Sequence, residues 1–245
     1  YYTADNVVVS VAGNVDEKEA EELAEKYFAS KFTRFTSAPQ RKAECGIPHN
    51  LYKTKRTEQS HIGLCMPAVS VKDERGIALN IANTVFGGGM SSRLFQRIRE
   101  DMGLAYSIYS YMSTYKESGV LEIYAGVNTS ARESAEAAIA EEIKKIAVSG
   151  VTEQEFLRGK EQIKSAFIMG QESTASQMLL YGRYLLMLDK IFDFDERVAK
   201  IENTSIEEVN AMAKEVFDLG KISTATVGPK RSPLKIVKFF ERVQV

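Results

Sequence analysis

The chain has 245 residues, with 32 Lys and Arg against 33 Asp and Glu, and 44% of its residues are hydrophobic. The net charge of −1 excludes a basic field for nucleic acid, and the hydrophobic fraction excludes a disordered chain. Two cysteines cannot make the disulfide framework of a small secreted fold, and no apolar run reaches the roughly 18 residues that a membrane helix needs.

The first part of the chain predicts a strand, a helix and then an irregular stretch. A β-branched run at 7–12 predicts a buried strand, and apolar residues at helical spacing over 16–29 predict a helix. This periodicity is then lost among prolines, glycines and polar residues. We therefore expect a strand–helix unit at 1–38, a linker at 39–58 and a second domain at 59–245.

The rest of the chain predicts one sheet and a set of helices. Strands are predicted at 61–66, where Pro67 ends the run, and at 105–112, 120–127 and 222–227. Helices are predicted at 73–86, about 91–102, 130–149, 152–188 with a polar interruption at 171–174, 205–217 and 232–243. Capping-box sequences begin at Ser130, Thr152 and Ser205. Hairpin strands followed by clustered helices indicate an α+β fold with a mostly antiparallel sheet.

One architectural pattern occurs twice along the chain. Residues 6–13 and 221–228 each predict a strand that ends at a glycine and precedes a helix. The two stretches share little sequence identity, and any two βα units can look alike. The pattern alone therefore leaves both an internal duplication and a chance similarity open.

Metal ligands and catalytic nucleophiles are poorly represented in the sequence. His49 and His61 are the only histidines, and neither lies in His-x-x-x-His or His-x-x-Glu-His spacing. Cys45 and Cys65 could complete a zinc site with them, although this spacing is weak against known zinc-binding patterns. No Gly-x-Ser-x-Gly sequence is present. We expect no metal site and no catalytic triad in this chain.

The run Gly87-Gly88-Gly89 precedes a predicted helix whose free N–H groups could bind an anion. The run lacks the Gly-Lys-Ser/Thr of a phosphate-binding loop, and it follows a helix where nucleotide-binding motifs follow a strand. A turn between two helices is therefore favoured over a nucleotide site.

Arg99 and Tyr106 form a candidate binding pair. On the predicted helix, Arg97 has acids at i+3 and i+4, whereas Arg99 and Arg93 have none at these positions. A break at Gly103 could turn the chain so that Arg99 and Tyr106 point the same way. Both side chains can donate hydrogen bonds to carbonyl oxygens and stabilise an oxyanion. Taken alone, a surface arginine and a sheet tyrosine are the more common explanation.

A longer motif places this pair in a family context. The sequence FGGGMSSRLFQRIREDMGLAYS, from Phe86 to Ser107, resembles the C-terminal-half motif of the pitrilysin/insulinase zinc metallopeptidases. These include the mitochondrial processing peptidases and bacterial processing-peptidase-like proteins. The opening YYTADNVVVSVAGNVD resembles the last strand and helix of that family's N-terminal half. The resemblance extends from Tyr2 to about Pro229.

The resemblance implies two related halves that close on a peptide, each built from βα repeats with an antiparallel sheet packed by helices. The zinc-binding His-x-x-Glu-His belongs to the N-terminal half and is absent here. This chain would then be the noncatalytic half of a zinc-dependent endopeptidase, inactive alone and without a cofactor, and residues 1–38 would end the zinc-carrying half. Arg99 and Tyr106 would bind substrate, with Tyr106 also acting in catalysis, and the loop of Gly87, Gly88 and Gly89 would lie near the substrate.

The resemblance also implies partners. These are a peptide substrate, the N-terminal half of the same protein and a second subunit in a homodimer or heterodimer. The alternative is an inactive partner or peptide-binding scaffold subunit of the same family. The start at Tyr1, without Met or a signal-peptide pattern, is typical of a piece of a longer protein. The compartment stays open, with the bacterial cytoplasm as the leading expectation.

Overall fold

The computed structural model describes residues 2–32 and 46–229, which divide into two compact units. The smaller unit comprises residues 1–43 and 164–199, and the larger comprises 44–163 and 200–245. The boundaries predicted at 38 and 59 concern the halves of a longer protein, which this division does not test, so they stay a prediction. Each unit is described by itself.

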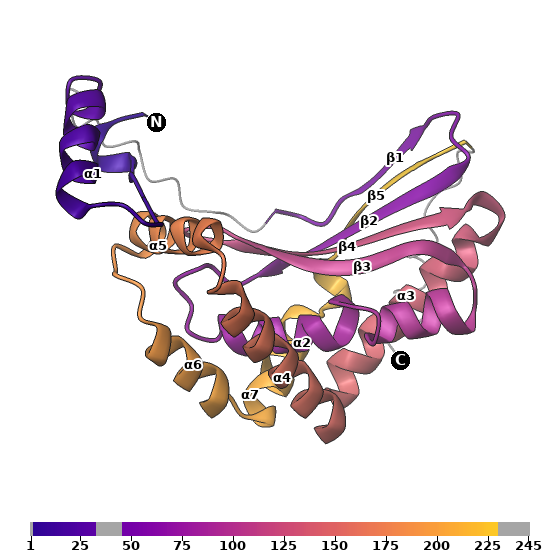
Figure 1. Cartoon of the computed structure of the whole chain (residues 1–245). Helices are drawn as coiled ribbons and strands as arrows, with labels where there is room; N and C mark the ends of the chain where they lie inside the picture. Colours follow the sequence, from indigo (N-terminus) through magenta and orange to yellow (C-terminus); the bar gives the residue numbers. More distant parts are fainter. Residues whose placement is uncertain (1, 33–45, 230–245) are drawn as a thin grey trace. The chain divides into compact units, whose positions relative to one another are not determined.

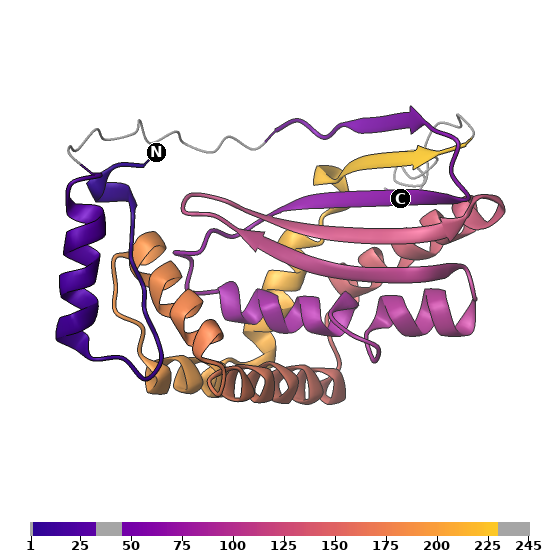
Figure 2. The same ribbon diagram turned by 45° about the horizontal axis from the view of Figure 1, so that its top comes forward.

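The larger unit is built on one five-stranded sheet with the strand order β1-β5-β2-β4-β3 (Figure 2). Its strands are β1 (Asn50–Thr54), β2 (Gln59–Ala68), β3 (Ala105–Thr114), β4 (Gly119–Asn128) and β5 (Ser223–Gly228). Neighbouring strands are antiparallel except β1 and β5, which run parallel. The predicted α+β class with a mostly antiparallel sheet is confirmed, and one parallel pair makes the sheet mixed.

Two details of the sheet differ from the prediction. β1 lies inside the interval 39–58, where the sequence shows no strand pattern, because an exposed edge strand buries little of either face. Pro67 lies within β2 and does not end it. The pairing with β5 stops at Cys65, so Pro67 lies where β2 has a neighbour on one side only, a position that tolerates a missing N–H.

Helices cover one face of this sheet (Figures 1 and 2). They are α2 (Gly76–Gly87), α3 (Arg132–Ser149) and α7 (Ile206–Val216). The first part of α4 (Glu153–Gly170) packs on α2, where Gly159 lies against Val85 and Ile81. The strand side chains on that face form the core, which includes Ile62, Leu64, Met66, Ile108, Leu121 and Ile123. Phe86 at the end of α2 meets Phe217 after α7 edge-to-face, with ring centroids 4.7 Å apart. Because strand side chains alternate, every second one points to the other face.

No helix in the described part of the larger unit covers that other face (Figure 2). Tyrosines of β3 and β4 gather on it. Tyr109 and Tyr111 on β3 are 45% and 43% exposed. The Tyr109 ring contacts that of Tyr124 on β4, with centroids 5.3 Å apart, and the Tyr124 hydroxyl lies 2.8 Å from His61 Nδ1 on β2. We call this tyrosine-lined surface the open face.

The smaller unit contains α1 (Glu17–Ala24), a π-helical turn at Glu25–Ala29 and α5 (Thr174–Leu188). The helix predicted at 16–29 is thus confirmed. The strand predicted at 7–12 is wrong for the described residues: the segment is extended, but it pairs with no strand. The Ser10 hydroxyl instead donates to the Met178 carbonyl at 2.7 Å. A strand pattern gives a strand only where it can pair with a sheet edge, and the described residues of the smaller unit contain no strand.

The helix starts show which capping sequences form. The reciprocal hydrogen bonds of the capping box are present at Thr152 and Ser205, as predicted. The box predicted at Ser130 does not form, because the Asn128 side chain accepts from the Ser130 N–H and hydroxyl and starts a 3₁₀ turn, Thr129–Ala131, before α3. The interruption predicted at 171–174 separates α4 from α5.

Two further differences complete the fold. Helix α6 (Phe194–Asn203) has no counterpart in the prediction, and the turn at Leu219–Lys221 precedes β5. The helix predicted at 232–243 lies outside the described residues, so the proposed repeat of strand, glycine and helix cannot be compared at its second copy.

Glu136 on α3 is a buried acid whose ionisation opposes folding. Its side chain is almost fully buried, and neither carboxyl oxygen has a hydrogen-bond partner among the described residues. Arg132 Nε lies 3.3 Å from one of these oxygens, and Glu133 adds a like charge. Burial raises the pKa of Glu136 to about 7, although Arg132 acts to lower it. The folded pKa therefore exceeds the value of 4.5 in the unfolded chain.

We predict that the protein loses stability between pH 4.5 and about 7 and that Glu136→Gln removes this loss. The stabilising contribution is fully present below the unfolded pKa, and its loss across this range is on the order of 2 to 3 kcal/mol. Urea unfolding at pH 5 and pH 8 measures it. A Glu136→Gln protein that shows the same change in stability between the two pH values as the parent would contradict this assignment.

Candidate functional site

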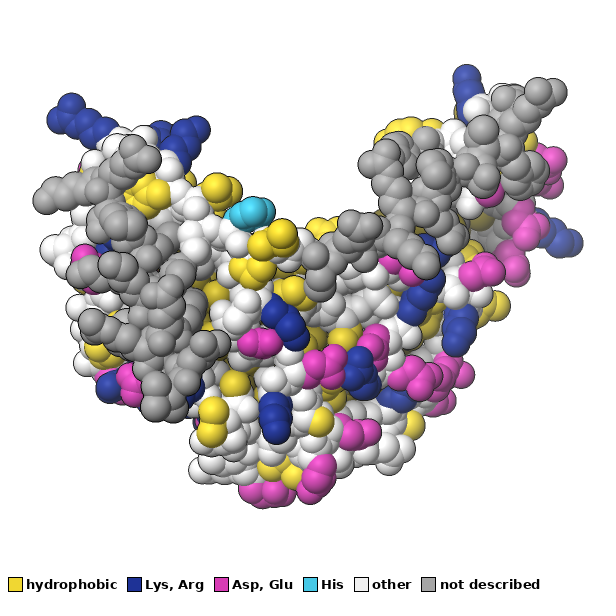
Figure 3. Space-filling model, turned by 180° about the vertical axis from the view of Figure 1, so that it is seen from behind, with side chains coloured by type: hydrophobic (Ala, Val, Ile, Leu, Met, Phe, Trp, Pro, Cys, Tyr) yellow, Lys and Arg dark blue, Asp and Glu magenta, His cyan; other side chains and the backbone are white. Residues whose placement is uncertain are grey.

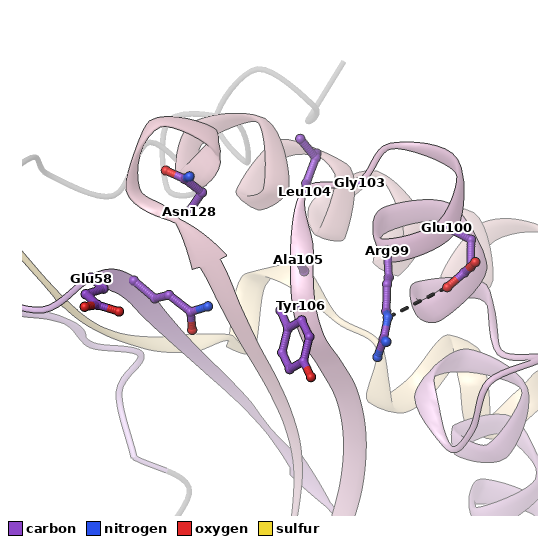
Figure 4. A pocket seen from close by; sticks show the side chains of 9 residues that line it. Glu58, Arg99, Glu100, Gly103, Leu104, Ala105, Tyr106 and Asn128 are labelled. Atoms are coloured by element: carbon purple, nitrogen blue, oxygen red, sulfur yellow. Dashed lines mark ion pairs between the residues drawn. The ribbon is translucent and has the colours of Figure 1, made fainter.

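An open cavity of about 420 Å³ lies beside the start of β3 (Figure 4). It is lined by residues from the start of β2, the end of the helical segment before β3, β3 itself and the end of β4. These are Glu58, Gln59, Arg99, Glu100, Gly103, Leu104, Ala105, Tyr106 and Asn128. The structure therefore brings the predicted pair, Arg99 and Tyr106, into one cavity. The three glycines at 87–89 do not line it.

A π-helical turn, Phe95–Asp101, carries Arg99 to the cavity. Ile98 is fully buried and anchors this segment on the core, while Arg99 keeps 39% of its side chain exposed. The segment ends at Gly103, whose φ of +61° is left-handed and favours glycine. The Leu104 N–H then donates to the Ile98 carbonyl at 2.9 Å, and the chain turns directly into β3.

A β-bulge turns Tyr106 to the open face. Ala105 pairs with Val127 and Ser107 pairs with Gly126, so Tyr106 is an extra residue in the ladder. If the strand alternated regularly back from the buried Ile108, Tyr106 would point into the core. The extra residue reverses the alternation, and Tyr106 is 74% exposed as a result. This placement depends on the pairing register and has no signal in the sequence.

Arg99 and Tyr106 lie against each other in the cavity. The Arg99 guanidinium carbon is 5.4 Å from the centre of the Tyr106 ring, and Figure 4 shows both side-chain ends pointing the same way. Arg99 Nε also lies 3.7 Å from Glu100 Oε1, which corrects the prediction that no acid on its own helix contacts Arg99. Both partners of this ion pair are exposed, so it neutralises the guanidinium only weakly.

The environment of Arg93 differs from the prediction more strongly. Its guanidinium donates to both carboxyl oxygens of Glu155, at 2.7 and 2.6 Å, and to the Gly150 carbonyl at 2.9 Å. Burial raises the pKa of Glu155, but hydrogen bonds from Arg93 and Thr152 outweigh it and hold the pKa at about 2. Describing Arg93 as unpartnered like Arg99 is therefore wrong. The partner lies 62 residues away, beyond any search of helix spacings.

The glycine run packs tightly at its first position. Gly87 is buried against Ser110 of β3, and a Cβ there would lie 2.7 Å from the Ser110 backbone nitrogen and in contact with its hydroxyl oxygen. That hydroxyl donates to Asn83 Oδ1 at 2.7 Å inside the core. Gly89 has more space, with the flexible end of Gln162 as its nearest neighbour. The predicted proximity of this loop to a substrate stays a prediction.

The candidate metal ligands that the structure describes do not form a metal-binding group. His61 and Cys65 lie on the open face of β2, and His61 contacts the Tyr124 hydroxyl. Cys45 lies outside the described residues. Among residues 2–32 and 46–229, no three His, Cys, Asp or Glu side chains are grouped so that they could hold a metal ion. These residues therefore do not fit a zinc site, and no metal-dependent step is assigned to them.

Two further properties of the surface bear on partners. Figure 3 shows acidic and basic side chains intermixed over the face that it presents. Across the described residues, every helix is too short or too polar to span a bilayer.

Sequence reasoning missed three residues that bear on the site: one contacts Arg99 without lining the cavity, and two line it. Phe95 is assigned by its helical spacing to the buried arc, yet it contacts Arg99. Gln59 and Asn128 begin β2 and end β4 and are direct partners in the ladder, so both reach the cavity. Only the spacing of Phe95 and Arg99, four residues apart, could have indicated such a contact.

Comparisons with known proteins identify similar chains. Residues 1–163 match the family model described as the peptidase M16 inactive domain. A protein of Bacillus subtilis described as the uncharacterized zinc protease YmxG is 38% identical over 217 residues, which are 89% of this chain and 53% of that protein. An uncharacterized zinc protease of Mycobacterium leprae is 34% identical, over 94% of this chain and 53% of that protein.

Solved structures share the fold. A peptidase M16 inactive domain from Pseudomonas fluorescens has a TM-score of 0.80 at 19% identity, over 91% of this chain and 53% of that chain. A protease from Helicobacter pylori has a TM-score of 0.78 at 20% identity, over 88% of this chain and 54% of that chain. The chain thus spans about half the length of the curated relatives and solved structures that it matches.

We predict that Arg93→Ala destabilises the protein by about 2 to 3 kcal/mol, because it leaves the carboxylate of Glu155 without its main partner. The contribution of the ion pair to stability is fully present above the unfolded pKa of 4.5 and is lost as the pH falls through the folded pKa of about 2. The variant should therefore also lose part of the acid dependence of stability. Urea unfolding at pH 7 and pH 3 measures both effects. Arg97→Ala is the control, since the Arg97 side chain is exposed and its ion-pair partner among the described residues is Asp101, at 3.9 Å. An equally small effect of the two variants would refute a structural role for Arg93.

We also predict that Gly87→Ala destabilises the protein by about 2 kcal/mol, because the new methyl group overlaps the Ser110 backbone. The matched variant Gly89→Ala should be tolerated, since its neighbour can move. Thermal unfolding of the two variants compares them directly. If both unfold at the parental temperature, the tight packing at Gly87 is not a constraint.

Proposed function

The chain belongs to the peptidase M16 inactive domain family, and on this basis we propose that it is the noncatalytic, substrate-binding half of a zinc-dependent endopeptidase. The relatives are described as zinc proteases, and the chain corresponds to about half of each. The zinc ion and the residues that activate water would then lie in the other half of the longer protein. The observation that carries the proposal is the meeting of Arg99 and Tyr106 in one open cavity.

Arg99 would hold a peptide by its backbone. A guanidinium has five N–H donors and no acceptor, so peptide carbonyl oxygens are natural partners. The weak contact with Glu100 leaves most of these donors available. Such hydrogen bonds form with the bound substrate and persist through the reaction, so Arg99 would contribute mainly to substrate binding.

Tyr106 would act more strongly on the transition state. Its exposed hydroxyl makes no hydrogen bond to the described residues, so it is free to donate to a carbonyl oxygen. Such a bond strengthens as the carbonyl becomes tetrahedral and its oxygen gains negative charge. Zinc, when bound in the other half, would supply Lewis acidity and an activated water. This chain would hold and orient the peptide.

The extended segment 7–12 of the smaller unit supports the proposal that this chain adjoins another half of a longer protein. Val9 and Val11 are 47% and 54% exposed on the extended segment 7–12, which pairs with no strand in the described residues. A β-branched segment of this kind is suited to complete a sheet that begins earlier in a longer chain. We therefore retain the proposal that residues 1–38 end the preceding, zinc-carrying half and that the two halves enclose an unfolded peptide.

The second candidate function is an inactive partner or peptide-binding scaffold subunit. The description of the matched family as an inactive domain and the lack of grouped metal ligands in the described residues are compatible with it. The two functions differ in the rest of the longer protein, where an intact His-x-x-Glu-His favours the peptidase. Peptide binding at Arg99 and Tyr106 is common to both.

We predict that, in the full-length protein, Tyr106→Phe lowers kcat on the order of 10²- to 10³-fold, as loss of one oxyanion donor typically does. Arg99→Ala should raise KM and lower kcat/KM, because it removes binding in both the ground and transition states. Cleavage of a fluorogenic peptide, with zinc content measured in parallel, tests both. Zinc content should stay at the parental level.

Two variants serve as controls. Tyr109→Phe removes a hydroxyl from the same strand and the same open face, and Arg97→Ala removes a charge from the same helical turn outside the cavity. Both should retain parental kinetics. If Tyr106→Phe and Arg99→Ala behave like these controls, the pair has no role in peptide cleavage. A full-length protein that binds peptide through Arg99 without cleaving it would establish the scaffold function.

A further inference from the structure

The guanidinium of Arg99 lies close to two aromatic rings. Its central carbon is 4.7 Å from the centre of the Phe95 ring and 5.4 Å from that of Tyr106. Both distances lie within the range of a cation–π contact. Phe95 is half-buried, which is unusual for a residue on the side of a helix that packs against a core. The exposed part of the Phe95 ring contacts Arg99.

Helical spacing and one local irregularity create this arrangement. Phe95 and Arg99 are four residues apart, so the helical segment places their side chains on the same face. The β-bulge turns the Tyr106 ring out of the core and into the cavity that Arg99 lines. Without the extra residue, Tyr106 would point into the core and its ring would not reach Arg99. The strand is thus irregular at the residue that supplies the second ring.

Aromatic contact restrains an arginine without using its donors. A long side chain free in solvent loses rotamer freedom when it binds, and this loss weakens binding. A carboxylate partner would restrain it but would occupy the N–H groups, as Glu155 does for Arg93. The Arg99 guanidinium carbon lies over the Phe95 and Tyr106 rings, and a ring face attracts a cation without occupying its N–H donors as a carboxylate does.

We propose that Phe95 is a positioning residue that holds Arg99 in its peptide-binding conformation. Phe95 does not line the cavity and would act only through Arg99. The proposal rests on the proposed function of Arg99 as a peptide ligand. The Phe95 ring would thus contribute to peptide affinity in addition to its packing against the core.

The experiment uses Phe95→Leu and Phe95→Met in the full-length protein, with peptide affinity measured by fluorescence anisotropy and KM and kcat measured where the peptide is cleaved. Both variants keep an apolar side chain and lose the ring, so one of them serves if the other folds poorly. We expect affinity to fall, or KM to rise, on the order of 3- to 10-fold with kcat nearly unchanged. Phe95→Tyr, which keeps the ring, should restore parental affinity.

A double-mutant cycle with Arg99→Ala separates positioning from simple structural loss. Once Arg99 is absent, Phe95→Leu should cause no further loss of affinity. If Phe95→Leu has no effect while Arg99→Ala weakens binding, or if the two effects add, the positioning role is refuted. Failure of Phe95→Tyr to restore affinity also refutes it. If Arg99→Ala itself has no effect, it is the proposed function that fails.

Discussion

Burial of one face of the sheet against α2, α3 and α7 is the constraint on which the rest of the larger unit depends. It fixes which strand side chains point to the helices and leaves their neighbours on the open face. Only every second residue of a strand can then contribute its side chain to a site on the open face, unless a bulge interrupts this alternation. The bulge at Tyr106 is that interruption, and it adds a phenol to the cavity without disturbing the core beside Ile108.

Arg93 and Arg99 show how the same side chain takes different roles on one short segment. Arg93 is enclosed, its donors are occupied by Glu155 and Gly150, and its removal should affect stability. Arg99 is restrained by rings and only weakly paired, so its removal should affect binding. The contrast follows from what surrounds each guanidinium, since their charge and helix are the same.

In the proposed peptidase, this chain would bind the peptide and the other half would hold the zinc. The chain belongs to the M16 inactive domain family, and its described part has hydrogen-bond donors of Arg99 and Tyr106 in an open cavity and no grouped metal ligands. A half of this kind can contribute to hydrolysis through binding and orientation, which are substantial terms in enzyme catalysis. The same surface would serve a scaffold subunit equally well, because peptide binding does not require zinc.

Local sequence patterns were sufficient to predict the family and many of the helices and strands of this protein. The long motif from Phe86 to Ser107 indicated the family, and the hairpin, the capping boxes at Thr152 and Ser205 and the break between α4 and α5 follow from hydrogen bonds between near neighbours. The sequence also singled out Arg99 and Tyr106. Only the tertiary structure decided the pairing of β1, the partner of Arg93 and the bulge at Tyr106. These depend on strand register and on side chains far apart in the chain, which come together only when the core packs.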